Sequence, residues 1–452
     1  MSAENNNTFK PFVLVLMALI LVLFTQYIPE GTKILFYETK EVDFFSDVRV
    51  EEEETSFINE SVQNLQIAGF PSFVINADKS SLFNSVLYFP PTENITGNTQ
   101  MLKKFASALA QSKSKKIRIA HFGDSVIEGD LISADLRKNL QAKYGGLGVG
   151  FVAINSMDIA FRTTTKLSYS DNWKFGSVFG QNSDKLPVGI NGAVSYTNGG
   201  SWVQYEVTNL YGVKHFTNAK LYYQSDNGGK ITISANNGAE KTFTLKGSKK
   251  VEELDFNLSG RNKSLKINIP NGTKGNFYGV SLEENTGIYV DNFPFRGNSG
   301  ISLRDIPESM FKDFSKHLDY DLIILNFGLN MLEQDTKDLG WYITAMNKNI
   351  ATIKSAFPEA GIVIIGVQDK AIKKGAKFVT DPSVKKVLEA QMKIVEESNV
   401  AFWNLYEAMG GEGAMAKWVA ENKASKDYTH LNTEGAREVA TLLSNALIGL
   451  NQ

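Results

Sequence analysis

The stretch IRIAHFGDSVIEGD, residues 117–130, joins an apolar segment to a glycine, an aspartate and a serine. Residues 117–122 predict a buried β-strand, and apolar side chains spaced by four over residues 132–140 predict a helix behind it. A strand, a tight turn and an amphipathic helix in this order are typical of a doubly wound α/β domain. Ser125 would then lie at the carboxyl end of the strand, where open α/β sheets place their active sites.

The same alternation returns in the C-terminal part of the chain. Buried strands are expected at residues 288–291, 322–325, 362–365 and 400–405, and helices at residues 339–357, 383–398 and 433–447. Short apolar strands that alternate with helices predict a parallel sheet covered by helices on both faces, a three-layer α/β/α domain.

Between residues 165 and 284 the pattern changes to a period of two. Asn-Gly pairs at positions 227–228, 237–238 and 271–272 mark hairpin turns between the alternating segments. We therefore expect an all-β sandwich over residues 165–285, inserted into an α/β domain whose two parts are residues 101–164 and 286–452.

The N-terminal region contains an uncharged apolar run, Pro11–Ile28. As a helix it would rise about 27 Å, close to the hydrocarbon thickness of a bilayer. No small residues follow it as a signal peptidase would require. Residues 1–30 therefore predict an uncleaved, single-pass anchor in the cell inner membrane, with the rest of the chain in the periplasm or outside the cell. Residues 31–100 are expected to form a stalk or a poorly defined region.

Composition excludes several kinds of site. The 452-residue chain has no cysteine, so disulfides and thiolate chemistry are excluded, and its four histidines show no metal-ligand spacing. We expect neither a metal nor an organic cofactor. A formal net charge of −2 gives no bulk attraction to nucleic acid, which is not expected as a partner.

Four polar residues are expected at one edge of the sheet or in the loop before the last helix. On its own, the tripeptide Gly123-Asp124-Ser125 favours a helix N-cap over a nucleophile. Asn330 follows the strand at residues 322–327, however, and Asp427 and His430 precede the last helix. A carboxylate three residues before a histidine can orient the imidazole, which can then take the proton of a serine. Together these residues predict a serine-hydrolase site.

On these motifs the chain resembles the SGNH (GDSL) hydrolase superfamily over residues 116–150 and 286–450. The resemblance implies a flavodoxin-like three-layer fold, with Ser125 as the nucleophile. It also implies that Asp427 orients His430, the general base. The family's third motif matches Gly328-Leu329-Asn330, although Met331 follows where the family commonly has an acidic residue.

The resemblance also implies an oxyanion hole, formed by the Ser125 N–H, a glycine N–H and the Asn330 side chain. The family's glycine motif falls best on Asn298-Ser299-Gly300, which implies Gly300 as the backbone donor. Gly297 is the alternative match.

The position of the β insert narrows the resemblance. Together with the stretch at residues 129–151, it is similar to bacterial peptidoglycan O-acetylesterases, which carry a carbohydrate-binding-like, jelly-roll-like β sandwich at this place. The implied reaction removes acetyl groups from an O-acetylated polysaccharide or peptidoglycan without a cofactor. Aromatic side chains of the insert either stack on sugar rings or fill the sandwich core; they are Trp202, Tyr205, Tyr222 and Tyr223.

Two other functions remain open. The same triad serves an O-acyltransferase that receives acetyl from a membrane acyl-transfer partner and passes it to a glycan. A non-catalytic glycan-binding scaffold with a vestigial site is the third possibility.

Overall fold

A computed structural model of the chain describes residues 33–34, 37–38, 93–155, 158–180, 182–332 and 338–450. The chain divides into two compact units, Met1–Leu87 and Tyr88–Gln452. The described residues of the first unit form one antiparallel pair, β1 (Lys33–Ile34) with β2 (Tyr37–Glu38).

The expected membrane anchor, residues 1–30, lies outside the described residues, as does nearly all of the expected stalk. Within the described part of the chain, no helix is both long and apolar enough to cross a bilayer. The anchor, and the location in the cell envelope that it implies, therefore stay predictions.

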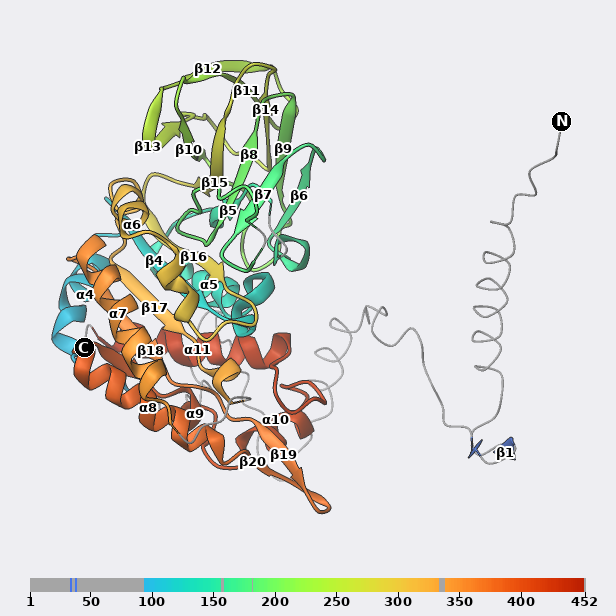
Figure 1. The fold of residues 1–452 in the computed structure, drawn as a ribbon, viewed down its shortest axis with the longest axis vertical. Coiled ribbons are helices and arrows are strands. Elements are labelled where there is room, and N and C mark those ends of the chain that lie inside the picture. Colours follow the sequence, from blue (N-terminus) through green and yellow to red (C-terminus); the bar gives the residue numbers. More distant parts are fainter. Residues whose placement is uncertain are drawn as a thin grey trace, which may run out of the picture. The chain divides into compact units, whose positions relative to one another are not determined.

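The second unit contains a mostly parallel sheet (Figure 1), in which the described residues place six strands in the order β16, β4, β17, β18, β21 and β3. Their bounds are Gly287–Pro294, Lys116–Gly123, Leu322–Asn326, Gly361–Ile365, Ala401–Trp403 and Thr96–Gly97. Only β3, at the edge, pairs antiparallel among these described strands. Numbered along the chain, the five parallel strands have the order 2-1-3-4-5, which is the flavodoxin-like arrangement.

This strand order creates a switch point beside β4. From β4 the chain passes to β16 on one side and then returns to β17 on the other side. In such sheets the loops at the carboxyl ends of the strands diverge at the switch point and leave a crevice there. The loops after β4, β16 and β17 therefore surround this crevice.

Helices join the parallel strands. Their bounds are α4 Lys103–Leu109, α5 Ser133–Tyr144, α6 Glu308–Phe314, α7 Gly340–Ala356, α8 Ser383–Ser398, α9 Leu405–Ala408, α10 Ala414–Ala420 and α11 Thr433–Gly449. α5 packs against α11, while α7 packs against both α6 and α8. Because parallel crossovers are right-handed, the reversal of strand order places α5 and α11 on one face and α6 to α8 on the other.

The expected α/β layers are confirmed by these elements. The segment expected as a helix at residues 383–398 is α8, and the apolar run at residues 322–325 lies in β17, whose side chains are all buried. A strand covered on both faces has no polar side, so a continuous apolar run identified it.

The residues between α5 and β16 form two antiparallel sheets. One has the order β13, β10, β15, β8 and β7, with β5 paired to β15, and the other has the order β12, β11, β14, β9 and β6. The strand bounds are β5 Gly150–Ala153, β6 Thr165–Tyr169, β7 Lys174–Ser177, β8 Ala193–Thr197, β9 Ser201–Val207, β10 Asn218–Ser225, β11 Gly229–Ala235, β12 Lys241–Leu245, β13 Ser248–Asp255, β14 Ser264–Ile269 and β15 Gly275–Glu283.

An apolar core lies between these two sheets, separate from the core of the parallel sheet. Because β5 pairs with β15, the antiparallel unit begins before residue 165, where the insert was expected to start. The division of the chain into domains itself stays a prediction.

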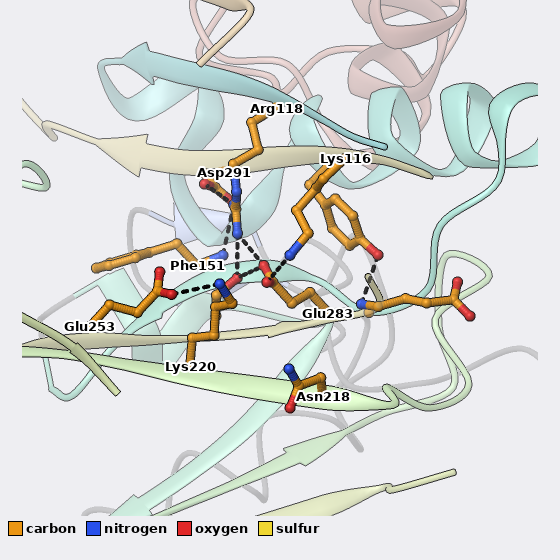
Figure 2. Close-up of polar contacts among 12 residues, drawn as sticks. Lys116, Arg118, Phe151, Asn218, Lys220, Glu253, Glu283 and Asp291 are labelled. Atoms are coloured by element: carbon orange, nitrogen blue, oxygen red, sulfur yellow. Dashed lines mark hydrogen bonds and ion pairs between the residues drawn. The ribbon is translucent and has the colours of Figure 1, made fainter. Parts of the chain in front are cut away.

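A buried ionic network joins the parallel sheet to the antiparallel unit (Figure 2). The Arg118 guanidinium of β4 donates to Asp291 Oδ2 of β16 at 2.7 Å and to Ser281 Oγ of β15 at 2.8 Å, and it also pairs with Glu283. Lys116 pairs with the same glutamate. Burial raises the pKa of Glu283, but the two cations outweigh burial and lower it to about 2. The network therefore holds the two sheets together, because separating them would leave buried charges without partners at a high cost in free energy.

Candidate active site

Ser125 lies directly beyond the end of β4. A Cβ atom at Gly123 would be 2.9 Å from Asn326 O of β17 and 2.9 Å from the Ile127 side chain, so the close approach of these segments requires glycine. The Asp124 carboxylate accepts a hydrogen bond from the Val126 N–H at 3.1 Å. The aspartate thus caps the turn, and the serine hydroxyl is left for the cavity.

The segment directly after the serine precedes the expected amphipathic helix. A six-residue 3₁₀ helix, Ser125–Asp130, comes first, and α5 begins only at Ser133. Extended backbone at Glu128 and a φ of 66° at Gly129 interrupt the helical path. The helix predicted over residues 132–140 is therefore confirmed as α5, but the kinked segment between it and Ser125 was not predicted, because apolar spacing records burial and not a local kink.

The structure brings together Ser125, His430 and Asp427. Ser125 Oγ lies 3.4 Å from His430 Nε2, and His430 Nδ1 lies 2.7 Å from Asp427 Oδ2. The contact with the carboxylate favours the tautomer in which Nδ1 carries the proton, so that the lone pair of Nε2 faces the serine. Burial raises the pKa of Asp427, but hydrogen bonds from the His430 and Thr429 N–H groups outweigh burial and lower it. The carboxylate is therefore ionised and oriented.

A hairpin supports the loop that carries the histidine. Strands β19 (Ala371–Lys374) and β20 (Lys377–Thr380) place Phe378 against Tyr428, with ring centroids 3.5 Å apart and an interplanar angle of 6°. The Ala371 N–H donates to Tyr428 O at 3.0 Å, and Tyr428 has a left-handed φ of 57°. The stacking holds an unfavourable backbone conformation two residues before His430. Sequence reasoning missed this support, because the two aromatic residues lie about 50 positions apart.

The candidate oxyanion donors are only partly brought together. Asn330 follows β17, and its Nδ2 donates to Asn298 O at 3.0 Å. The Gly300 N–H donates to Asn298 Oδ1 at 2.8 Å. Gly297 lines the cavity that contains Ser125 and Asn330, whereas Gly300 does not. The N–H of Gly300, the donor implied by the resemblance, is thus already bonded within its own loop. We therefore favour the Gly297 N–H as the backbone donor to an oxyanion.

A cavity of about 590 Å³ contains the serine and the histidine. Arg296, after β16, and Glu128 form an ion pair of 3.2 Å on its wall. Phe161 and Tyr211 complete another part of the wall. Phe161 ends the 3₁₀ helix η4 (Asp158–Phe161) between β5 and β6, and Tyr211 lies in the loop between β9 and β10. The antiparallel unit therefore helps to form the cavity that contains Ser125, which no local sequence signal indicated.

Asp124 is a second carboxyl group in this site. Its side chain is buried, with 1% of its surface exposed. Burial raises its pKa from 3.8 to about 7, although the hydrogen bond from Val126 and the charge of His430 oppose the rise. This group therefore changes its charge near neutral pH within the turn that carries Ser125.

His121 on β4 lies beneath the turn rather than in the cavity. Its ring is buried, its Nδ1 lies 2.9 Å from Ser133 Oγ, and burial lowers its pKa to about 4. The ring is therefore neutral at physiological pH, and its buried position beside Ser133 indicates a structural role. Among the described residues, no group of three or more histidine or acidic side chains is arranged to hold a metal ion.

Three of the four aromatic side chains considered for sugar stacking are core residues. Tyr205, Tyr222 and Tyr223 expose 2% of their surface or less. Trp202 is partly exposed, and the Lys266 ammonium lies 4.9 Å from the centre of its ring. Tyr205 and Tyr223 thus fill the sandwich core, whereas Tyr222 packs into the core of the parallel sheet, and none of the three offers a sugar platform.

The parallel sheet and the inserted antiparallel unit together have the architecture that the resemblance to SGNH/GDSL hydrolases implied. Comparison with solved structures supports this fold. A structure titled "Peptidoglycan O-acetylesterase in action, 5 min" is similar to 79% of this chain and 99% of its own chain, with a TM-score of 0.66 and 22% sequence identity. The resemblance inferred from the motifs is therefore confirmed at the level of the fold.

Other comparisons are weaker. A family two carbohydrate esterase from Cellvibrio japonicus aligns at a TM-score of 0.26 and 11% identity, over 64% of this chain and 98% of its own chain. A segment of 133 residues is 31% identical to the IMP-specific 5'-nucleotidase 1 of Plasmodium falciparum, which is 28% of this chain and 26% of that protein. The chain thus spans about a quarter of the length of this curated relative. No protein-family profile matches the chain.

Proposed function

We propose that this protein is a serine carbohydrate esterase that removes O-acetyl groups from an envelope glycan such as peptidoglycan. The observation that carries the proposal is the continuous contact from Asp427 through His430 to Ser125, the last two of which line one cavity. A hydroxyl, an imidazole and a carboxylate in this order form an activated nucleophile. The 3.4 Å between Oγ and Nε2 is long for a hydrogen bond, as is common in sites without substrate.

Acylation follows from this geometry. Ser125 Oγ bonds to the acetyl carbonyl carbon while its proton passes to His430 Nε2. The carbonyl oxygen becomes an oxyanion, which the Ser125 and Gly297 N–H groups and Asn330 Nδ2 would stabilise. The bond from carbon to the sugar oxygen then breaks, and His430 gives its proton to that oxygen. Ser125 is left as an acetyl ester and the sugar hydroxyl is free.

Deacylation uses the same groups with water. A water molecule attacks the acetyl carbon and gives a proton to His430, and the second oxyanion occupies the same donors. The bond from carbon to Oγ then breaks, His430 returns the proton to Ser125, and acetic acid leaves. Asp427 stabilises the imidazolium in both halves of the cycle but stays ionised.

The choice of glycan rests on the fold comparison and on the insert. The solved structure with the most extensive match reported above is titled as a peptidoglycan O-acetylesterase. Phe161 and Tyr211 of the antiparallel unit line the cavity wall, which supports contact between the insert and the sugar that leaves. We also propose that the apolar run Pro11–Ile28 anchors the protein in the inner membrane, with the catalytic unit in the periplasm or outside the cell.

The test is acetate release from O-acetylated peptidoglycan and from p-nitrophenyl acetate by the purified full-length protein. Ser125→Ala is expected to lower turnover by at least roughly a thousandfold, the scale seen when a triad nucleophile is lost. Ser259→Ala, which removes an exposed hydroxyl of the antiparallel unit, serves as the matched control and should keep full turnover.

Other outcomes identify the alternatives. Transfer of acetyl to an added glycan that is faster than hydrolysis would identify an O-acyltransferase, which uses the same three residues and a membrane acyl-transfer partner. Glycan binding without acetate release, unaffected by Ser125→Ala, would identify a non-catalytic scaffold and reject the esterase.

A further inference from the structure

A second cavity, of about 470 Å³, adjoins the catalytic cavity. The two cavities share three wall residues, Glu128, Phe161 and Arg296. The second cavity extends from these residues between β16 of the parallel sheet and strands β5, β7 and β8 of the antiparallel unit. Neither the triad nor the oxyanion donors line it, so the mechanism described above leaves it without a role.

The lining of the second cavity is mainly hydrocarbon. Its apolar side chains, besides the shared Phe161, include Phe151, Ala153, Phe175, Phe179, Ala193 and Pro294. Phe179 is 42% exposed and Phe161 is 55% exposed, although both are large and apolar. Open aromatic surface inside a cavity favours an apolar occupant, because covering it removes hydrocarbon from water.

The polar groups of this cavity already bond to the protein, including Arg162, whose Nε donates to Thr164 Oγ1 at 3.1 Å. Asn292 Nδ2 donates to Ile127 O at 2.9 Å and to Ser133 Oγ at 2.7 Å. Ser177 Oγ accepts from the Phe179 N–H at 3.2 Å. A sugar ring buried here would lose water from its hydroxyls without gaining enough partners, which is costly. A hydrocarbon chain has no such requirement, so the chemistry of the lining favours an aliphatic occupant over a sugar.

The passage between the two cavities runs beside an ion pair. Arg296 Nη1 lies 3.2 Å from Glu128 Oε1, and the guanidinium lies 5.8 Å from the centre of the Phe161 ring. The Arg296 side chain is 65% exposed, whereas that of Glu128 is 16% exposed, so the arginine is the partner that can turn towards solvent. A chain that starts at the serine can therefore pass beside Glu128 when the Arg296 side chain moves outwards.

We propose that the second cavity binds the acyl chain of the ester, so that the site accepts aliphatic acyl groups longer than acetyl. This inference rests on the proposed esterase function and specifies the acyl part of its substrate. The carbonyl stays at Ser125 and the sugar leaves on the open side of the catalytic cavity, while the hydrocarbon tail lies along Phe161 and enters the apolar cavity. Each methylene buried there contributes about 0.8 kcal/mol, which corresponds to roughly a fourfold gain in kcat/KM.

The test is the chain-length profile of hydrolysis by the full-length protein, with linear p-nitrophenyl esters from acetate to decanoate. We expect kcat/KM to rise about fourfold per methylene up to the length that the cavity holds. Ala193→Leu and Ala153→Leu, each of which places a larger side chain in the second cavity, should lower the ratio of hexanoate to acetate hydrolysis by at least about tenfold. Ala239→Leu, an exposed position of the antiparallel unit, is the matched control and should keep that ratio.

The outcomes separate this inference from the function on which it rests. Acetate hydrolysis with a flat or falling profile would overturn the acyl site and leave the esterase intact. A rising profile that both filling variants retain would also overturn it, since the gain would then come from elsewhere. Failure to hydrolyse any ester, with a folded protein, would reject the proposed function itself. Two filling variants from different strands are used so that one unfolded variant does not prevent the measurement.

Discussion

Replacing Asp124 by asparagine should reveal a carboxyl group that opposes folding at neutral pH. The amide of Asp124→Asn would keep an oxygen for the Val126 N–H but could not ionise. In the folded protein burial raises the pKa of Asp124 from 3.8 to about 7. At pH values between 3.8 and about 7, Asp124 is protonated in the folded state but has lost its proton in the unfolded state. The stability due to this proton is therefore complete below about pH 3.8 and is lost as pH rises to about 7.

The size of the effect follows from this difference. The rise from 3.8 to about 7 is about 3 pH units, and at 1.36 kcal/mol for each unit it corresponds to about 4 kcal/mol. The free energy of unfolding of Asp124→Asn, minus that of the native protein, should therefore increase by about 4 kcal/mol between about pH 4 and about pH 8. This difference in the free energy of unfolding should increase with pH, and not decrease, because burial raises the pKa of Asp124.

The assay is urea unfolding at several pH values, followed by circular dichroism. Asp226→Asn is the matched control, because it makes the same chemical change at an exposed aspartate. A constant difference for Asp124→Asn across the same range would refute the reasoning, since it would mean that the carboxyl group titrates alike in the folded and unfolded chains.

Three further predictions concern the site and its support. Asp427→Ala should lower kcat by roughly ten-thousandfold with little change in the circular dichroism spectrum, because the imidazole loses its orienting partner. Asn330→Ala should lower kcat by about a hundredfold to a thousandfold while KM changes little, as expected for a donor to the oxyanion; an unchanged kcat would exclude this role. Glu283→Gln should lower the free energy of unfolding by about 3 kcal/mol in urea titrations at neutral pH, because it leaves Arg118 and Lys116 with less compensating charge in a buried place. Since the pKa of Glu283 is lowered from 4.5 to about 2, this loss should shrink as pH falls from about 4.5 towards 2, and a loss that stays constant would argue against an ionic role.

The local elements of the α/β unit could be predicted closely from the sequence. The helix expected at residues 339–357 is α7, Gly340–Ala356, and the strand expected at residues 117–122 is β4, Lys116–Gly123. A helix buried on one face has apolar residues at a regular spacing, and a strand buried on both faces has a continuous apolar run. These elements can therefore be predicted without knowledge of the fold. The short spacing between Asp427 and His430 is local in the same sense.

The contacts between distant segments could not be predicted in this way. Arg118 and Glu283, which join the two sheets, lie 165 positions apart. The choice between Gly297 and Gly300 depended on Asn298, whose side chain accepts the Gly300 N–H. Periodicity carries no information on such pairings, because they depend on the strand order and on the paths of the loops.

The sequence by itself thus indicated which residues would carry the proposed chemistry, because a serine, a histidine and an aspartate occupy short motifs beside periodic strands and helices. Only the tertiary structure decided what surrounds them: the buried carboxyl at Asp124, the ring of Phe378 behind the histidine loop, and the apolar cavity beyond Arg296. The physical reason is that burial and cavity shape are properties of surfaces which meet only after the crossovers of the parallel sheet have brought separate segments together.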